Sequence, residues 1–172
     1  MMQQSFFQHI QQLQTAAEAL LAGQPYDGLL IGSGQLQPRF LDDSYYPFRA
    51  NPHFLRWLPF ITQQPQCWLL IEAGRKPQLY YPMPDDFWHM TPALPDGWWS
   101  SAFTISPVAG RPSIQRQHLA VIAEQLPDFA APSWQHNPPA LLQVLHAERR
   151  VKSDWEAHCL RQANCQAVKG HR

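Results

Sequence analysis

The chain has 172 residues, its 13 Lys and Arg balance 13 Asp and Glu, and 45% of its residues are apolar, which fits one domain of about 100–200 residues. The neutral balance without a basic run excludes an electrostatic footprint for nucleic acid, and no apolar stretch approaches the roughly 18 residues of a membrane span. The first residues, MMQQSFFQH, lack the basic and apolar regions of a secretory signal. We therefore expect a cytoplasmic protein that binds neither nucleic acid nor membranes.

The first predicted elements are a helix and a short strand. Apolar residues recur at helical spacing over residues 6–22, and Gly23 and Pro25 end that pattern. Residues 29–31 form an apolar run after a turn signal, as at the start of an αβ unit whose sheet is covered on both faces.

The middle of the chain predicts a loop followed by strands. Residues 40–60 mix aromatics with prolines and show no sustained period, which predicts an ordered loop region. Residues 67–72 and 78–82 predict the two strands of a hairpin joined through Gly74, and a weaker strand is expected at residues 102–106.

The following segments are less regular. Residues 85–89 predict a short loop or helical turn, and residues 113–117 a helix. Residues 119–123 fit either a strand or the second half of that helix, because propensity does not decide between them. Residues 137–139, Asn-Pro-Pro, predict the start of a helix that continues through Arg150.

A capping box predicts one more helix. The Ser153 hydroxyl can accept from the backbone N–H of Glu156, whose carboxylate can reach back to Ser153. From Trp155 a stripe of small residues recurs every four positions through Ala167, and such a stripe needs a larger partner. Two interpretations stay open: a natural C-terminal helix closed by Gly170, or a helix cut from a longer protein.

Few motifs in the chain carry chemistry. The cysteines Cys67, Cys159 and Cys165 form no CxxC pair and predict reduced, buried thiols. Ser33 lies between two glycines without the spacing of a nucleophile elbow, and no glycine-rich phosphate loop occurs. We therefore expect neither a catalytic serine nor a nucleotide site.

Two groups of acidic residues remain as candidates. Among the eight histidines, only His89 has nearby carboxylates at a spacing typical of metal ligands, namely those of Asp85 and Asp86. The alternative is that an aspartate here caps the start of a helix by accepting hydrogen bonds from backbone N–H groups. Asp42 and Asp43 repel each other, so one of them needs a donor or water, and a loop or cap role is the simplest interpretation. The many aromatic residues around this second pair instead indicate a surface that packs against something; they are Phe40, Tyr45, Tyr46, Phe48, Phe54 and Trp57.

Three blocks of the sequence together carry a resemblance to a known family: FLDDSYYPFRANPHFLRWLPF (40–60), CWLLIEAGRKPQLYYPMPDDFWH (67–89) and VKSDWEAHCLRQANCQAVKGHR (151–172). With these blocks the chain closely resembles the N-terminal part of bacterial Xaa-Pro dipeptidases, or prolidases, in the branch that includes the organophosphorus acid anhydrolases. This resemblance implies an α/β fold with a mixed β-sheet flanked by helices, of the creatinase/prolidase N-terminal type. It also implies that residues 1–150 form this domain and that residues 151–172 are the first helix of an absent pita-bread catalytic domain.

The resemblance further implies an activity and a dimer. Enzymes of this family hydrolyse dipeptides with a C-terminal proline, using two manganese ions held by two aspartates, a histidine and two glutamates, and the resemblance assigns those ligands to positions beyond Arg172. We therefore expect this chain to hold no metal and no catalytic residue, and to hydrolyse no dipeptide by itself. In the family's homodimers one N-terminal domain covers the active site of the other subunit, and the matching positions here are Asp43 and Trp88. The implied roles are that Asp43 pairs with the ammonium of the dipeptide and that Trp88 excludes water and longer peptides.

Other interpretations stay open. One is a free-standing, non-catalytic binding module that descended from this domain. A reading frame that continues past Arg172 with the five metal ligands favours the peptidase, and a stop codon directly after Arg172 favours the module. The least favoured interpretation is a small independent enzyme that uses Asp85, Asp86 and His89.

Overall fold

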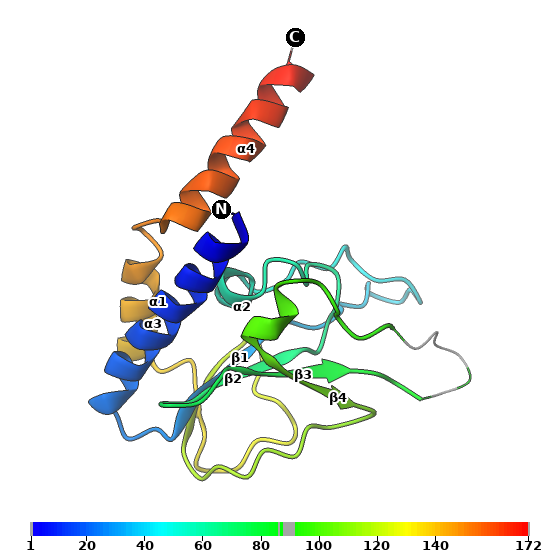
Figure 1. Cartoon of the computed structure of the whole chain (residues 1–172). Coiled ribbons are helices and arrows are strands. Elements are labelled where there is room, and N and C mark those ends of the chain that lie inside the picture. The colour runs from blue at the N-terminus through cyan, green and yellow to red at the C-terminus, as the bar shows by residue number, and fades with distance from the viewer. Residues whose placement is uncertain (1, 86, 88–91, 172) are drawn as a thin grey trace.

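A six-stranded sheet lies at the centre of the protein, whose structure, a computed structural model, describes residues 2–85, 87 and 92–171 (Figure 1). In chain order the strands are β1 (Gly28–Gly32), β2 (Trp68–Ile71), β3 (Gln78–Pro82), β4 (Thr104–Val108), β5 (Leu119–Ile122) and β6 (Gln135–His136). They lie side by side in the order β4-β3-β2-β1-β5-β6. β2 is antiparallel to β1 and β3, whereas β1 with β5, β3 with β4 and β5 with β6 are parallel, so the sheet is mixed.

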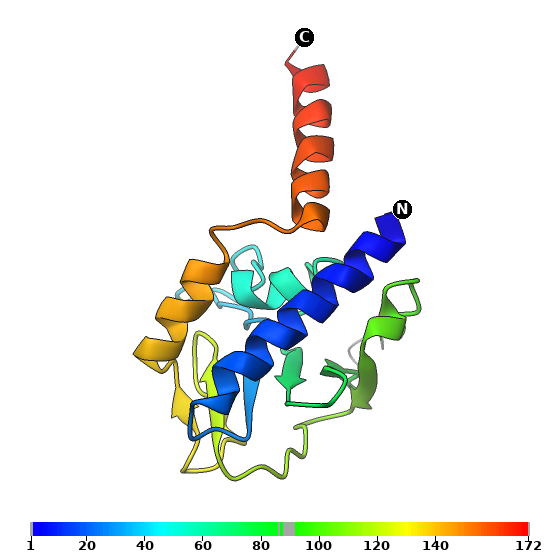
Figure 2. The same ribbon diagram turned by 60° about the vertical axis from the view of Figure 1, so that its left-hand side comes forward.

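Helices cover one face of this sheet. The described helices are α1 (Met2–Ala22), α2 (Pro52–Trp57), the 3₁₀ helix η1 (Ser100–Ala102), α3 (Pro139–Glu148) and α4 (Asp154–Gly170). Figures 1 and 2 show α1, α2 and α3 packed over the sheet and α4 projecting away from the body of the domain. The predicted α/β fold with a mixed sheet and flanking helices is confirmed. None of the described helices is both long and apolar enough to cross a membrane.

The two faces of the sheet have different covers. Leu29 and Ile71 join the helices in one buried cluster, while Leu30, on the opposite face, belongs to a second cluster. The second cluster is closed by Phe129 and Trp134, which lie in the irregular segment between β5 and β6. Both faces are therefore covered, as expected, but irregular chain replaces helices on the second.

Most of the predicted N-terminal elements are confirmed with small shifts. α1 contains the predicted helix and begins at Met2, β1 contains residues 29–31, and β2 and β3 form the predicted antiparallel hairpin. The turn between β2 and β3 uses Gly74 at φ 68°, a conformation that favours glycine. β4 begins later than the strand expected at residues 102–106, because residues 100–102 form η1 first.

The helix predicted at residues 113–117 is not formed. Arg116 pairs with Glu72 at the end of β2, and the Asp27 carboxylate accepts from the next two backbone N–H groups at 3.1 and 2.8 Å. These contacts hold the chain away from helical bonding. The residues that follow form β5, because they pair in parallel with β1, which decides the alternative left open above.

A short helix, α2, interrupts the segment 40–60, where only a loop was predicted. The Asn51 side chain accepts from the N–H of His53 at 2.9 Å, and Pro52 occupies the first turn. The helix has six residues, too few to display a helical period, yet it buries Phe54 completely. The sequence contained the residues that start a helix, but the segment is too short to show the helical periodicity from which a helix could have been predicted.

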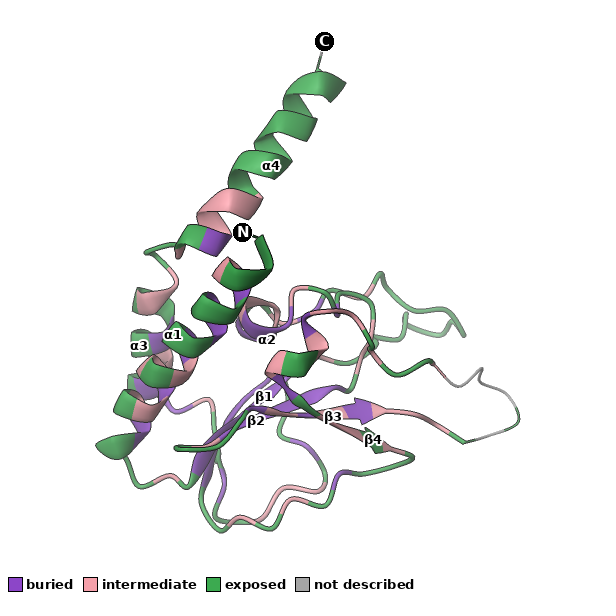
Figure 3. Cartoon of the chain, in the orientation of Figure 1, coloured by how far each residue is buried: buried purple, intermediate pink, exposed green. Residues whose placement is uncertain are grey.

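The C-terminal helices confirm both predictions, with α3 ending at Glu148 rather than Arg150. The capping box of α4 is formed, because Ser153 Oγ accepts from the N–H of Glu156 at 3.2 Å and the Glu156 carboxylate accepts from the N–H of Ser153 at 2.9 Å. Trp155 is buried, but the rest of the helix is half-buried or exposed (Figure 3).

The expectation of buried thiols holds for one cysteine only. Burial raises the pKa of the Cys67 thiol to about 12, so this group is inert at neutral pH. Cys159 is half-buried and Cys165 is exposed, because α4 carries both away from the sheet.

Candidate functional site

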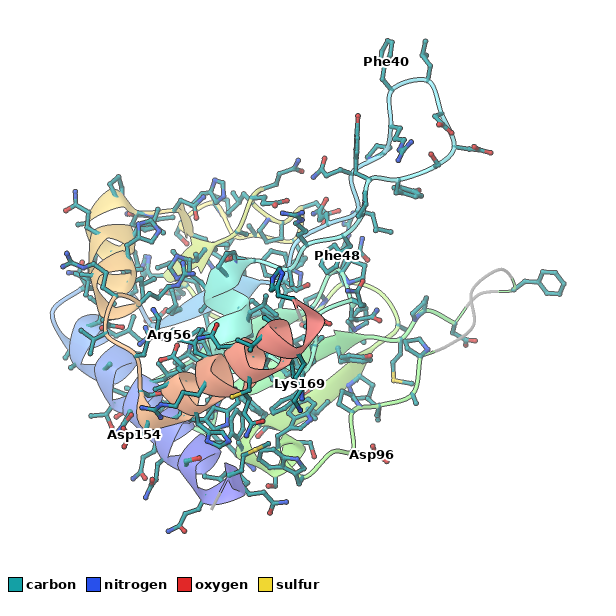
Figure 4. The ribbon with its side chains drawn as sticks, turned by 90° about the horizontal axis from the view of Figure 1, so that it is seen from above. Phe40, Phe48, Arg56, Asp96, Asp154 and Lys169 are labelled. Atoms are coloured by element: carbon teal, nitrogen blue, oxygen red, sulfur yellow. The ribbon has the colours of Figure 1, made fainter. Side chains whose placement is uncertain are left out.

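A hairpin of residues 37–46, here called the 37–46 hairpin, protrudes from the body of the domain with Phe40 near its end (Figure 4). The N–H of Tyr46 donates to the Gln37 carbonyl at 2.9 Å, and the N–H of Arg39 donates to the Ser44 carbonyl at 3.0 Å. These cross-strand bonds, with a bridge between Pro38 and Tyr45, define its register. Its shape is thus set mainly by its own backbone.

Asp42 and Asp43 lie next to each other at the tip of the hairpin but are in different environments. Leu41 adopts a left-handed conformation with φ 54°, and Asp42 Oδ1 then accepts from the N–H of Ser44 at 3.0 Å. This hydrogen bond holds the pKa of the Asp42 carboxyl below its usual range. Asp43 follows in the turn and is exposed. Asp42 therefore has the capping role that the sequence allowed, and Asp43 lies at the tip facing solvent.

Large apolar side chains at this tip are exposed to water. Phe40 is 89% exposed and Leu41 91%, and Tyr45 and Tyr46 are more than half exposed. The guanidinium of Arg39 lies 5.3 Å from the ring centre of Tyr46, a cation–π contact that covers one ring. A cluster of apolar side chains this exposed is typical of an interaction surface.

The aromatic residues expected to form one surface in fact divide into two groups. Phe40, Tyr45 and Tyr46 are exposed on the hairpin, and Phe48 is half-buried near its base. Phe54 and Trp57 belong instead to α2 and to the core under α1. The prediction of an aromatic surface is thus wrong for these last two, because α2 turns them inward.

The second predicted group lies partly outside the described residues. Trp88, Asp86 and His89 are not described, so neither the predicted role of Trp88 nor the Asp85/Asp86/His89 cluster is tested. Asp85 is exposed on the segment that leaves β3, and Phe87 is 92% exposed. In Figures 1 and 4 this segment leaves β3 toward the same side of the body as the 37–46 hairpin.

Two kinds of candidate chemistry, a metal cluster and the serine Ser33, can be compared with the described residues. In the ranges 2–85 and 92–171 and at residue 87, no three His, Cys, Asp or Glu side chains are grouped as metal ligands. Ser33 is buried, where its Oγ accepts from the N–H of Cys67 at 3.0 Å and lies 3.1 Å from the Gln64 carbonyl, to which it donates. Its hydroxyl is therefore engaged in holding the end of β1.

A second notable cluster, which the sequence did not reveal, joins α4 to the rest of the domain. We call it the α4 joint: His9, Arg56, Glu148, Ser153, Trp155 and Glu156. The buried His9 ring lies 2.9 Å from both the Arg56 carbonyl oxygen and Ser153 Oγ, and it stacks on Trp155 with ring centres 5.3 Å apart. Of these contacts, only the capping box could be predicted from neighbouring residues in the sequence. The contact between His9 and Ser153 could not, because the two residues are 144 positions apart.

Comparison with known proteins assigns this arrangement to a family. The family model described as "Xaa-Pro dipeptidase, N-terminal domain" matches residues 4–147. An Xaa-Pro dipeptidase of Pseudoalteromonas atlantica is 39% identical over 171 residues, which are 95% of this chain and 38% of that relative. One of Erwinia tasmaniensis is 39% identical over 174 residues, covering 96% of this chain and 39% of the relative.

Among solved structures, one described as an aminopeptidase P of Bacillus anthracis aligns with a TM-score of 0.42 and 12% identity, over 85% of this chain and 36% of the other. The chain spans about two fifths of the length of the curated relatives it matches. Because the family model covers most of the sequence, including the strands, α2 and most of α1 and α3, the chain belongs to the Xaa-Pro dipeptidase N-terminal domain family.

Proposed function

We propose that this chain is the N-terminal domain of a manganese-dependent, cytoplasmic Xaa-Pro dipeptidase that hydrolyses dipeptides with a C-terminal proline. The observation that carries the proposal is the family match over residues 4–147, together with relatives of that name at 39% identity over 95% and 96% of the chain. The described residues supply no ligand set for manganese, so the proposal assigns the metals and the hydrolytic step to the part of the enzyme outside this chain. The division into residues 1–150 and the start of a catalytic domain at 151–172 belongs to the same proposal.

The proposed contribution of this domain is a lid over the active site of a second subunit in a homodimer. The 37–46 hairpin supports this role because it extends from the body and exposes Phe40 and Leu41, which are costly to leave in water. Packing against another subunit would remove that apolar area from solvent. The role of Trp88 in the same lid rests on the sequence resemblance alone.

Asp43 gives the lid a chemical preference. A carboxylate at the mouth of a pocket attracts the free ammonium of a dipeptide and forms a charge-assisted hydrogen bond with it. In a longer peptide the ammonium lies farther from the scissile bond, so the same carboxylate would select for length. Because the contact is made both before and during the reaction, its loss should raise KM more than it lowers kcat.

The test uses the full-length enzyme with manganese and an Xaa-Pro dipeptide as substrate. We expect Asp43→Asn to raise KM about ten- to hundredfold, because one charge-assisted hydrogen bond contributes about 1.5–3 kcal/mol. Asp42→Asn is the matched control, since it removes the same charge one residue away from a carboxylate that is used inside the turn. An unchanged KM for Asp43→Asn, or an equal rise for both variants, would contradict the role of Asp43.

Two further measurements test the wider proposal. Sedimentation of the full-length enzyme should show a dimer that Phe40→Ser with Leu41→Ser converts to monomers. The 172-residue chain should show no dipeptidase activity with added manganese. Turnover by that chain would contradict the proposal, and a reading frame that stops directly after Arg172 would leave the non-catalytic binding module as the better account.

A further inference from the structure

The hydrogen bonds of His9 define which of its ring nitrogens carries the proton. The Arg56 carbonyl oxygen can only accept, so His9 Nε2, at 2.9 Å from it, must be the donor. In the neutral ring Nδ1 is then an acceptor, and the group it faces at 2.9 Å is the Ser153 hydroxyl. The geometry therefore requires the Nε2–H tautomer, with the Ser153 O–H donating to Nδ1.

The same Ser153 hydroxyl is the N-cap of α4. Its oxygen accepts from the N–H of Glu156 at 3.2 Å while its proton points to His9. One hydroxyl thus links the start of α4 to α1, and through the His9 ring to the carbonyl of Arg56 in α2. Three helices meet at a single imidazole.

The direction of α4 depends on its first turn. Trp155 is the buried residue of this helix among those described, and it stacks on His9. Beyond the first turns the helix extends from the body without comparable cover (Figure 3). A helix of this length spans about 25 Å, so a rotation of about 10° at its base moves its far end by about 4 Å.

Charged groups surround His9 on the helices that pack against it. Arg56 comes from α2, Glu148 from α3 and Glu156 from α4; Arg56 lies 3.5 Å from Glu148 and 3.8 Å from Glu156. Lys152 and Asp154 line, with His9, a surface depression of about 480 Å³ through which a proton can reach the ring from solvent.

We propose that His9 is a protonation-controlled latch for α4. The neutral ring in its Nε2–H tautomer holds the first turn of α4 against α1 and α2. A proton taken up from solvent at Nδ1 reverses this hydrogen bond, so that Nδ1–H donates to Ser153 Oγ, and it places a buried positive charge near the Arg56 guanidinium, which disfavours the closed arrangement and loosens the attachment of α4. Since α4 is the last described helix, the latch would control the angle at which the chain leaves this domain. This inference does not depend on the proposed peptidase activity.

The electrostatics give the direction of the switch. Burial lowers the pKa of His9 below 6.5; the hydrogen bond to Arg56 and the charge of Glu156 raise it in part, and the charge of Arg56 lowers it further. The ring is therefore neutral, and the latch closed, at pH 7. Acidification through this lowered pKa opens it.

The first test is the tautomer itself, read from the ¹⁵N shifts of histidine side chains in the 172-residue chain at pH 7.5. We expect His9 to give the Nε2–H pattern, with its signal assigned by its loss in His9→Gln. An Nδ1–H tautomer, or a ring already protonated at pH 7.5, would overturn the proposal.

The second test is amide hydrogen exchange in the first turn of α4. Between pH 7.5 and pH 5 we expect exchange at Glu156 and Ala157, corrected for the intrinsic effect of pH, to accelerate about tenfold as the first turn of α4 opens more readily, while β1 and β5 stay protected. His9→Gln should show the fast exchange already at pH 7.5. His53→Gln is the control, because its imidazole is also buried but stacks on His146 of α3, and it should leave the α4 response intact.

Either of two results would refute the latch: exchange at Glu156 and Ala157 that does not respond to pH, or a response shared equally by the sheet. Both can be read from the unaltered protein if His9→Gln does not fold.

Discussion

The α4 joint and the 37–46 hairpin both extend beyond the sheet, but they are held in different ways. The joint is a largely buried network that connects α1 and α2 with the end of α3 and the start of α4, which lie far from them in sequence. The hairpin is held by backbone hydrogen bonds between residues a few positions apart, and its large side chains point into water. The side chains of the joint stabilise the fold, whereas those at the hairpin tip are available to bind a partner.

The sharpest test of this difference is the same substitution in each region. Phe6 is fully buried beside the joint, with its ring centre 5.1 Å from that of Trp155 and 5.3 Å from that of Trp98. Phe6→Ala should lower the free energy of unfolding by about 3–5 kcal/mol through lost burial and a cavity. Phe40→Ala on the hairpin should change it by less than about 0.5 kcal/mol. Urea denaturation of both variants measures this, and similar losses would break the comparison.

Lowering the pH should destabilise the helices around His53 more than the 37–46 hairpin. Burial lowers the pKa of His53 from 6.5 to about 4, helped by the nearby charges of Arg149, His146 and Arg56. Between these two pH values His53 is protonated in the unfolded chain but not in the folded chain. The free energy of unfolding therefore falls as the pH drops from 6.5 towards 4, by up to about 3 kcal/mol.

His53→Gln removes this titration, so its free energy of unfolding should depend less steeply on pH in that window. On the hairpin the pKa of Asp42 is lowered, so its contribution persists above its unfolded pKa and fades only at lower pH. A parallel pH dependence for His53→Gln and the parent chain, measured by denaturation at each pH, would show that His53 is not the group responsible.

A pair of serines extends the comparison to smaller effects. Ser153→Ala removes the N-cap of α4 and the partner of His9, and it should cost about 1 kcal/mol. Ser44→Ala in the hairpin keeps the backbone N–H that Asp42 uses, so its cost should stay below about 0.5 kcal/mol. Thermal unfolding of the two variants under one condition gives the difference directly.

The smallest expected effect on stability is at Asp43. Because this carboxylate is exposed at the tip, Asp43→Asn should leave the free energy of unfolding within about 0.5 kcal/mol of the parent chain. Together with the raised KM expected in the full-length enzyme, this would separate function from folding at one residue. A large loss of stability would instead assign Asp43 to the fold.

Local patterns in the sequence were enough for the elements with strong periodicity or caps. α1 has an unbroken apolar face, β2 and β3 flank a glycine turn, and the capping box marks the start of α4. The pair Asp42-Asp43 was also recognisable as a candidate, but the residues themselves did not distinguish the two carboxylates, and only the family resemblance singled out Asp43. The bond from Ser44 to Asp42 distinguishes them, and it depends on the left-handed conformation of Leu41.

Other features needed the folded chain because their causes are distant in sequence. The segment around Arg116 loses its helical tendency to an ion pair with Glu72, and β5 becomes a strand because β1 lies beside it. The tautomer of His9 is set by a carbonyl in α2 and a hydroxyl before α4. By itself the sequence determined the fold class and the family resemblance, because local periodicity and residue blocks carry both. Which side chains are buried, paired or exposed was decided only by the tertiary structure, since those states depend on groups that the chain brings together from far apart.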